Sequence, residues 1–231
     1  AVKELSQSMA NPTEDDWGRM KKVVRFLKGQ PRYIMRFGYQ ENPKGINAWS
    51  DSDFAGCVRT RKSTSGGLVR HGGHIIRSWS TGQAVTALSS GEAEYYALVK
   101  ATSQGIGIRN MLEDLGGECE RPIEVNTDAT AAIGIVNRVG VGKIRHIEVN
   151  QLWLQEKVFK GEVVIHKVDT KANLADALTK PLTEEEMAEH VRLCGSSSDR
   201  SRHPIAPRVE EVMDVEELRD SGNDAANRIR W

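Results

Sequence analysis

The sequence of 231 residues contains no run of about 18 uncharged apolar residues, which is the length that a membrane-spanning helix needs. Its first residues, AVKELSQSMANPTEDDW, lack the basic and then apolar pattern of a secretory signal. We therefore expect an intracellular protein, cytoplasmic or nuclear, with no signal peptide and no membrane partner.

Cysteine is also scarce. Cys57, Cys119 and Cys194 are the three in the sequence, and none belongs to a CxxC pair. This excludes a disulfide framework and a cysteine-rich zinc site as the basis of the fold. Hydrophobic residues make up 39% of the chain, which is enough for one sizeable core.

The formal net charge is zero, but the two signs are separated along the chain. Residues 183–231 hold 12 acidic residues and 7 arginines, so residues 1–182 carry the balancing positive charge. Residues 17–40 and 54–91 contain no acidic residue but several lysines and arginines. Such stretches suit a surface that binds a polyanion. Chance clustering on solvated faces is the alternative.

Three regions can be separated along the sequence. Residues 1–44 are predicted to form a connecting segment, with a helix over 11–29 that begins at a Thr13–Asp16 capping box. Residues 45–182 read as a compact α/β domain. Residues 183–231 read as an acidic, largely flexible tail, with a linker over 195–208 and a short acidic helix over 209–220.

The central region alternates between strand and helix patterns after an antiparallel start. This order predicts a mixed sheet covered by helices. The predicted strands are 46–51, a hairpin over 66–80, 122–127 and 162–168, and the predicted helices are 90–115, 129–137, 145–159 and 173–180.

Four acidic residues fall where predicted elements begin or end. They are Asp51 and Asp128 at strand ends, and Glu94 and Asp176 in the first turns of helices. Each has an ordinary alternative as a turn or capping residue, and Asp53 competes with Asp51 for the same role. Glu94 begins an apolar stripe along its helix, whereas Glu92 forms a capping box with Ser89.

Converging carboxylates of this kind could hold two divalent cations for an in-line phosphoryl displacement. Magnesium prefers such oxygen ligands. Together with the basic stretches, which would receive a phosphate backbone, the four acids indicate a nuclease.

Several ordered motifs in the same region also resemble a known family. They are WSDSDFAG (49–56), RKSTSGG (61–67), ALSSGEAEYYAL (87–98), VNTDATAAI (125–133), KIRHIEVNQLWLQEKV (143–158) and VDTKANLADALTKPL (168–182). Together they resemble the ribonuclease H domain of copia-type retrotransposon polyproteins. Residues 5–29 are similar to the segment that joins this domain to the reverse transcriptase.

The resemblance implies a ribonuclease H-like fold, a five-stranded mixed sheet flanked by helices. It implies cleavage of the RNA strand of an RNA–DNA hybrid with two magnesium ions, for which manganese is a plausible substitute. The residues that match the family's metal-binding catalytic positions are Asp51, Glu94, Asp128 and Asp176.

The resemblance suggests roles for further residues. His166 is read first as a strand residue and second as the family's product-release histidine. Contacts with the nucleic acid are expected from Arg61, Lys62, Ser63, Thr64, Lys143, Arg145 and His146. The reverse transcriptase of the parent polyprotein is a further candidate partner.

Two other functions remain open from the sequence. The chain could be a non-catalytic relic that still binds nucleic acid, or a related nuclease with another substrate, such as structured DNA. The four intact carboxylates favour an active enzyme, because without a metal they would repel a polyanion.

Overall fold

A computed structural model of the chain describes residues 2–30, 32–120, 122–140 and 152–199, together with Ser201 and Ile205. The predicted nucleic-acid contacts Lys143, Arg145 and His146, and the predicted helix over 209–220, lie outside these residues. Within the described part of the chain, no helix is both long and apolar enough to cross a membrane.

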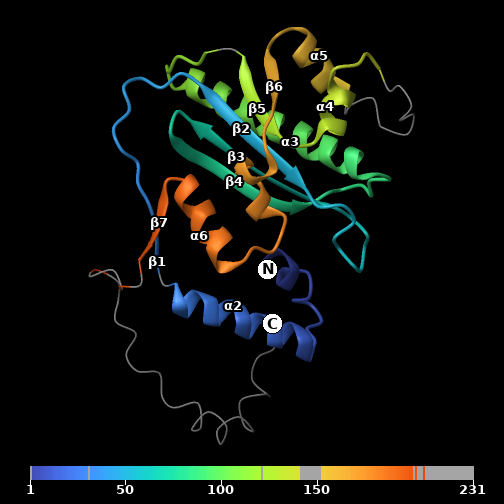
Figure 1. Ribbon diagram of the computed structural model, residues 1–231, viewed down its shortest axis with the longest axis vertical. Helices are drawn as coiled ribbons and strands as arrows, with labels where there is room; N and C mark the ends of the chain where they lie inside the picture. The colour runs from blue at the N-terminus through green and yellow to red at the C-terminus, as the bar shows by residue number, and fades with distance from the viewer. Residues whose placement is uncertain are drawn as a thin grey trace, which may run out of the picture.

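The centre of the molecule is a five-stranded sheet in the order β4-β3-β2-β5-β6 (Figure 1). Strands β2, β3 and β4 are antiparallel, whereas β5 and β6 run parallel to β2. The predicted mixed sheet flanked by helices is therefore confirmed. The strands are β2 (Ile46–Ser52), β3 (Thr64–His71), β4 (His74–Gly82), β5 (Ile123–Thr127) and β6 (Val163–Lys167).

The predicted hairpin is formed by β3 and β4, with Gly72 and Gly73 between them. Gly72 has a φ of +57°, a conformation that glycine adopts without steric cost. The turn thus lies where the sequence HGGH places it.

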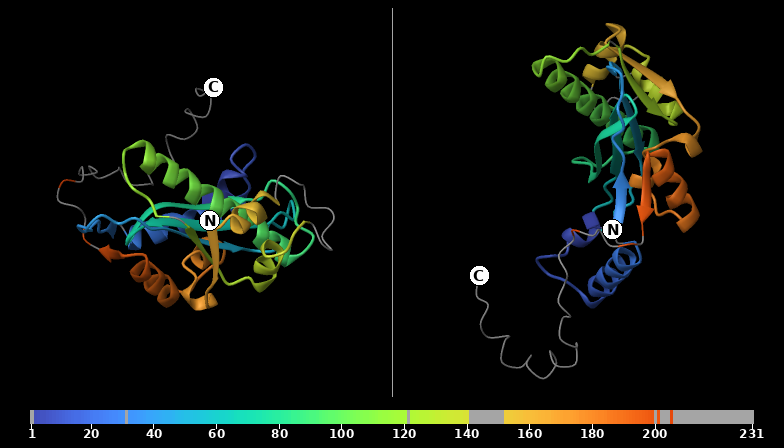
Figure 2. Two further views of the ribbon diagram at one scale, coloured as in Figure 1. Left: turned by 90° about the horizontal axis from the view of Figure 1, so that it is seen from above. Right: turned by 90° about the vertical axis from the view of Figure 1, so that its left-hand side faces the viewer.

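Helix α3 (Ser90–Asp114) covers one face of this sheet, and α4 (Thr130–Val136) and α5 (Trp153–Phe159) pack beside it (Figure 2). The predicted apolar stripe of α3 is buried, and Leu98 and Ala101 have no exposed surface. Gly105 lets the helix approach β5, because a Cβ there would lie only 3.2 Å from Ile123. The long helix is therefore fixed firmly against the strands that carry the candidate site.

The start of α3 differs in detail from the predicted capping box. Ser89 accepts a hydrogen bond from the Glu92 backbone, as expected. The Glu92 side chain, however, accepts from the backbone of Leu88 and from the Tyr96 hydroxyl, and only 1% of Glu92 is exposed. The nearby tyrosine gives the carboxylate a buried partner that a local sequence pattern does not reveal.

The predicted helix over 173–180 is wrong in type. The chain forms one short 3-10 turn there, η3 (Asp176–Leu178), which contacts β2 and β3, and a second, η2 (Thr170–Ala172), directly before it. The Asn173 side chain caps Ala175 and is itself bonded to the sheet, and Pro181 follows directly after Lys180. Asn173 therefore fixes the start of this segment to the sheet, and Pro181 disfavours a helical conformation at Lys180.

The flanking regions lie beside each other at one end of the sheet. Helices α1 (Val2–Ser6) and α2 (Glu14–Gly29) precede β1 (Arg32–Met35), and α6 (Glu184–Leu193) precedes β7 (Ser196–Asp199). Strands β1 and β7 form a separate antiparallel pair (Figure 1). Helix α2 begins at the predicted Thr13–Asp16 capping box.

The pairing of β7 corrects the expected linker over 195–208. Ser196–Asp199 are polar, but a strand pairs through its backbone, which composition does not report. An ion pair between Arg32 and Asp199, at 3.5 Å, adds to the pairing. The domain boundaries at 44/45 and 182/183 stay a prediction.

Candidate active site

Two of the predicted acids lie at the ends of neighbouring parallel strands. Trp49 of β2 is paired with Asn126 of β5, and Asp51 and Asp128 each follow two residues later. The carboxyl ends of parallel neighbours meet at one edge of a sheet. Asp51 is the more enclosed, with 1% of its surface exposed.

Glu94 reaches the same edge from α3. The backbone of Ser52, the residue after Asp51, lies near enough to the Glu94 carboxylate to favour the charged form and so to lower its pKa. One of its oxygens, Oε2, is buried and has no hydrogen-bond partner among the described residues. Glu94 thus brings into the site a carboxylate oxygen that accepts no hydrogen bond from the described residues.

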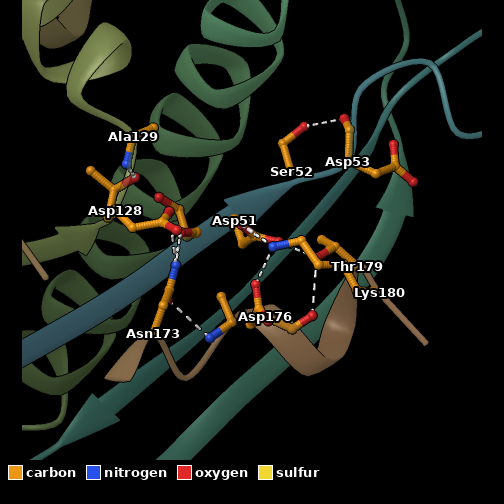
Figure 3. A network of polar contacts seen from close by, with 12 residues as sticks. Asp51, Ser52, Asp53, Asp128, Ala129, Asn173, Asp176, Thr179 and Lys180 are labelled. Carbon is orange, nitrogen blue, oxygen red and sulfur yellow. Dashed lines mark hydrogen bonds and ion pairs between the residues drawn. The ribbon is translucent and has the colours of Figure 1, made fainter. Parts of the chain in front are cut away.

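Asp176 enters the site from η3, on the other side of the sheet from α3 (Figure 3). Asn173 fixes this turn to the strands, because its Nδ2 lies 3.0 Å from the Ser50 carbonyl and 3.4 Å from Asp128 Oδ1. Gly66, paired with Asp51 across the sheet, leaves room for the turn. A Cβ on Gly66 would lie 2.7 Å from the Thr179 methyl group.

Two of the assembled acids, Asp51 and Glu94, have raised pKa values. Burial raises the pKa of Asp51 to about 6, and the charges of Asp176 and Asp128 act in the same direction. Burial also raises the pKa of Glu94 to about 8, with further contributions from Asp51 and Asp128. Carboxylates that are costly to ionise together are typical of sites that bind cations or move protons.

Two residues of the same turn bind these acids directly. Thr179 Oγ1 donates a hydrogen bond to Asp51 Oδ2. Lys180 Nζ donates to Asp176 Oδ1 and lies 3.7 Å from Asp51 Oδ1 (Figure 3). Partial burial lowers the pKa of Lys180, but the hydrogen bond to Asp176 and the charge of Asp51 outweigh it, and the net pKa is raised.

Asp53, the rival of Asp51, has a different environment. Its Oδ1 accepts a hydrogen bond of 2.6 Å from the backbone of Thr64, across the β2–β3 pair. In Figure 3 its side chain lies away from Asp128 and Asp176. The arrangement therefore assigns Asp53 to holding the loop between β2 and β3, and leaves Asp51 as the strand-end acid of the site.

The donor set fits magnesium chemically, because all four side chains offer carboxylate oxygens and Glu94 has an unused one. Among the described residues, however, no group of three or more His, Cys, Asp or Glu side chains is arranged to hold a metal ion. The Lys180 ammonium lies between Asp51 and Asp176, where it already supplies a positive charge.

The other predicted residues lie around this edge with different exposure. His166 is an exposed residue of β6, as its first interpretation predicts, and any role in product release stays a prediction. Arg61 is exposed, and Lys62 Nζ donates to the Ala84 carbonyl. Ser63 and Thr64 are buried, and their hydroxyl groups accept hydrogen bonds from Ala55 and Lys3.

Sequence reasoning missed the residues that position the acids. They are Gly66, Asn173, Thr179 and Lys180. The last two could have been found from their spacing, because they follow Asp176 by three and four residues and so return to its side of a helical turn. The role of Asn173 depends on the strand opposite it, which no local pattern shows.

Comparison with known proteins places the chain among retrotransposon polyproteins. It is 35% identical over 185 residues to the retrovirus-related Pol polyprotein from transposon RE2 of Arabidopsis thaliana, covering 79% of this chain and 13% of that protein. It is 30% identical over 200 residues to the corresponding polyprotein from transposon TNT 1-94 of Nicotiana tabacum, covering 86% and 15%. The chain thus spans about an eighth of the length of these relatives. No protein-family model matches it.

Among solved structures, LC11-RNase H1, isolated from compost by a metagenomic approach, is similar to this chain. The two are 16% identical with a TM-score of 0.40, over 58% of this chain and 92% of that one. At this TM-score the similarity adds nothing to the fold assignment, which rests on the strand order and directions of the sheet itself. As the resemblance to copia-type elements predicts, the chain belongs to the retrovirus-related Pol polyproteins of transposons.

Proposed function

We propose that this chain is a metal-dependent endonuclease, a ribonuclease H, that hydrolyses the RNA strand of RNA–DNA hybrids. One observation carries the proposal. Asp51 of β2, Glu94 of α3, Asp176 of η3 and Asp128, directly after β5, gather at one edge of the sheet. Burying several acids together is unfavourable unless cations offset their charge. Membership in a retrotransposon polyprotein family supports this choice of enzyme.

Two magnesium ions, or manganese in their place, would be held by these four acids. When bound, such a pair activates a water molecule and stabilises the leaving oxygen of a phosphodiester. The chain's own residues prepare the site. Asp51 is held at the end of a paired strand, and Asn173 keeps Asp128 in place by a hydrogen bond. Glu94 is carried by the first turns of α3.

The hybrid would meet the protein beside this edge. The loop before β3 carries Arg61, which is exposed, and Lys62. A positive charge at this point would bind the phosphate backbone and position the strand. The proposed contacts through Ser63 and Thr64 would need these buried residues to become accessible. We propose that His166, exposed on β6, assists product release.

The rest of a polyprotein is the second partner that we propose. Helix α2 has no buried residue, and its large apolar side chains are exposed. The homologous polyproteins are about eight times longer than the matched region, so further domains accompany it in those proteins. A neighbouring reverse transcriptase would cover part of α2.

Cleavage of a labelled RNA–DNA hybrid tests the activity. With Mg²⁺ the chain should cut the RNA strand, and EDTA should abolish cutting. Asp51→Asn should reduce the rate by about a hundredfold or more, because a metal ligand contributes several kcal/mol to transition-state stabilisation. The matched control is Asp53→Asn, which lies two residues away and should retain most of the activity.

The outcomes separate the candidate functions. Equal losses in the two variants would contradict the assignment of Asp51. Binding of the hybrid without metal-dependent cleavage would identify a non-catalytic relic. Cleavage of branched DNA in preference to the hybrid would identify a different substrate.

A further inference from the structure

Two of the four acids of the candidate site, Asp51 and Asp176, share one positively charged partner among the described residues. Both ion pairs that these acids form with described residues are with Lys180. Its Nζ binds Asp176 and lies 3.7 Å from Asp51, and Figure 3 shows it between the two carboxylates. An ammonium group thus lies in the place where the proposed function requires a divalent cation.

Neighbouring groups strengthen this arrangement. Thr179 donates to the second oxygen of Asp51, so each oxygen of that carboxylate faces a donor from the same turn. Thr179 Oγ1 is also 3.0 Å from the backbone carbonyl of Asp176. The short turn η3 therefore presents an acid, a hydroxyl and an ammonium together.

Lys180 is well suited to leave this position. Its side chain is 42% exposed, whereas that of Asp51 is 2% exposed. A lysine has a flexible four-carbon stem and a strongly hydrated head, so its ammonium can move into water while the strand-borne carboxylate stays. The two partners differ in mobility, and the mobile one is the cation.

We propose that Lys180 is a built-in counterion that occupies the metal-free site, and that divalent cations must displace it from Asp51 and Asp176 in order to bind. The inference rests on the proposed function, since it concerns the same metal site. Lys180 is thus a positioning residue that competes with the cofactor.

Titration of the metal-free chain with Mg²⁺ by calorimetry, without nucleic acid, tests the competition. Lys180→Met keeps most of the side-chain volume and removes the charge. Because the competitor is lost and the acids are left without their counterion, the variant should be half-saturated at about three- to tenfold lower Mg²⁺. Lys180→Arg should stay close to the wild type, because it keeps the charge.

The matched control is Lys171→Met. Lys171 is exposed on η2, in the connection between β6 and η3, and forms no ion pair with the four acids among the described residues, so its loss should leave the Mg²⁺ affinity unchanged. Equal or weaker Mg²⁺ binding by Lys180→Met would overturn the proposal while leaving the metal site intact. Failure of every form to bind Mg²⁺ would instead contradict the proposed function and with it this inference.

A second measurement uses the wild-type chain and does not depend on the folding of a variant. Acetylation of lysines by an amine-reactive ester, read by mass spectrometry, reports the access to each ammonium group. Saturating Mg²⁺ should increase the modification of Lys180 and leave that of Lys171 unchanged. An unchanged or reduced modification of Lys180 would show that the metal does not displace it.

Discussion

Two regions of the molecule place side chains against their usual preference, and they do so in opposite ways. At the edge where β2 and β5 end, the Asp51 carboxylate is buried and the other three acids are half-buried. Along α2, large apolar side chains are exposed, including Trp17, Val24 and Leu27. Buried charge and exposed apolar surface both mark places where a protein binds something else.

The comparison shows that the two regions prepare for different partners. The acids are fixed by strands, by α3 and by Asn173, so their positions are determined by the core. Helix α2 has no buried residue and is determined mainly by its own capping box. A rigid cluster of acids suits a small cation, whereas an exposed helix suits a large apolar surface. The predictions below test this difference, beginning with the largest effect.

Asn173→Ala should reduce hybrid cleavage about ten- to a hundredfold, since residues that orient metal ligands have effects of this size. The substitution removes the hydrogen bonds to Ser50 and Asp128. Initial rates at saturating Mg²⁺ measure the loss.

Asn126→Ala is the matched control for this change. Asn126 donates to the carbonyl of Ala48 on the same strand, but two residues further from the site. The Asn126→Ala substitution should lower the free energy of unfolding by a similar amount, but it should reduce the cleavage rate much less. If Asn126→Ala and Asn173→Ala lost equal activity, the site would not depend specifically on the hydrogen bonds of Asn173.

Glu94→Gln should stabilise the metal-free chain at pH 8. The folded-state pKa of Glu94 is about 8, above its ordinary value near 4.5, so between these pH values the folded state binds more protons than the unfolded state. Its stability therefore falls as the pH rises through this window, and an amide removes that loss. We expect the melting temperature in EDTA to rise by a few degrees at pH 8, with little difference near pH 4.5.

Glu124→Gln serves as the control, because Glu124 is an exposed residue of β5 on the same sheet. It should leave the melting temperature unchanged at both pH values. If Glu94→Gln lowered the melting temperature at pH 8, or raised it equally at pH 8 and pH 4.5, this would contradict a pKa of Glu94 raised by burial and by the neighbouring acids.

The smallest effect is expected on α2. Val24 and Leu27 are 57% and 55% exposed, so a Val24→Ser, Leu27→Ser double variant should shift the melting temperature by about one degree or less. In contrast, Leu98→Ala in the core should cost about 2–5 kcal/mol of unfolding free energy. Thermal unfolding of the three proteins tests both. A large loss in the α2 variant would show that this face is packed within the chain.

The sequence predicted most of the fold, for identifiable reasons, and the roles of the four acids stay a prediction. Helix α3 has a long apolar stripe, and the β3–β4 turn has two glycines, so local patterns determine both. The turn at Asp176 and the strand at Ser196–Asp199 were not predicted correctly. The first is shortened by Asn173, which binds a strand more than a hundred residues earlier in the chain, and the second depends on pairing with β1.

The convergence of the acids could be predicted from the sequence, whereas the position of Lys180 beside them could not. Acids at element ends can be recognised one by one, and their register follows once β2 and β5 are known to be parallel neighbours. The position of Lys180 between Asp51 and Asp176 depends on how closely η3 packs against β3. Gly66 sets this packing distance from a different part of the chain.

The β1–β7 pair brings two distant points of the chain together. Met35 faces Ser196 in the ladder, so the chain enters and leaves the intervening 160-residue stretch at neighbouring points. A segment whose ends meet in this way can be inserted into a host loop, or joined end to end and opened elsewhere, with little change to its interior. The hydrogen bonds between β1 and β7 would hold the two ends of the segment together. A protein fused before β1 would then lie close to one fused after β7.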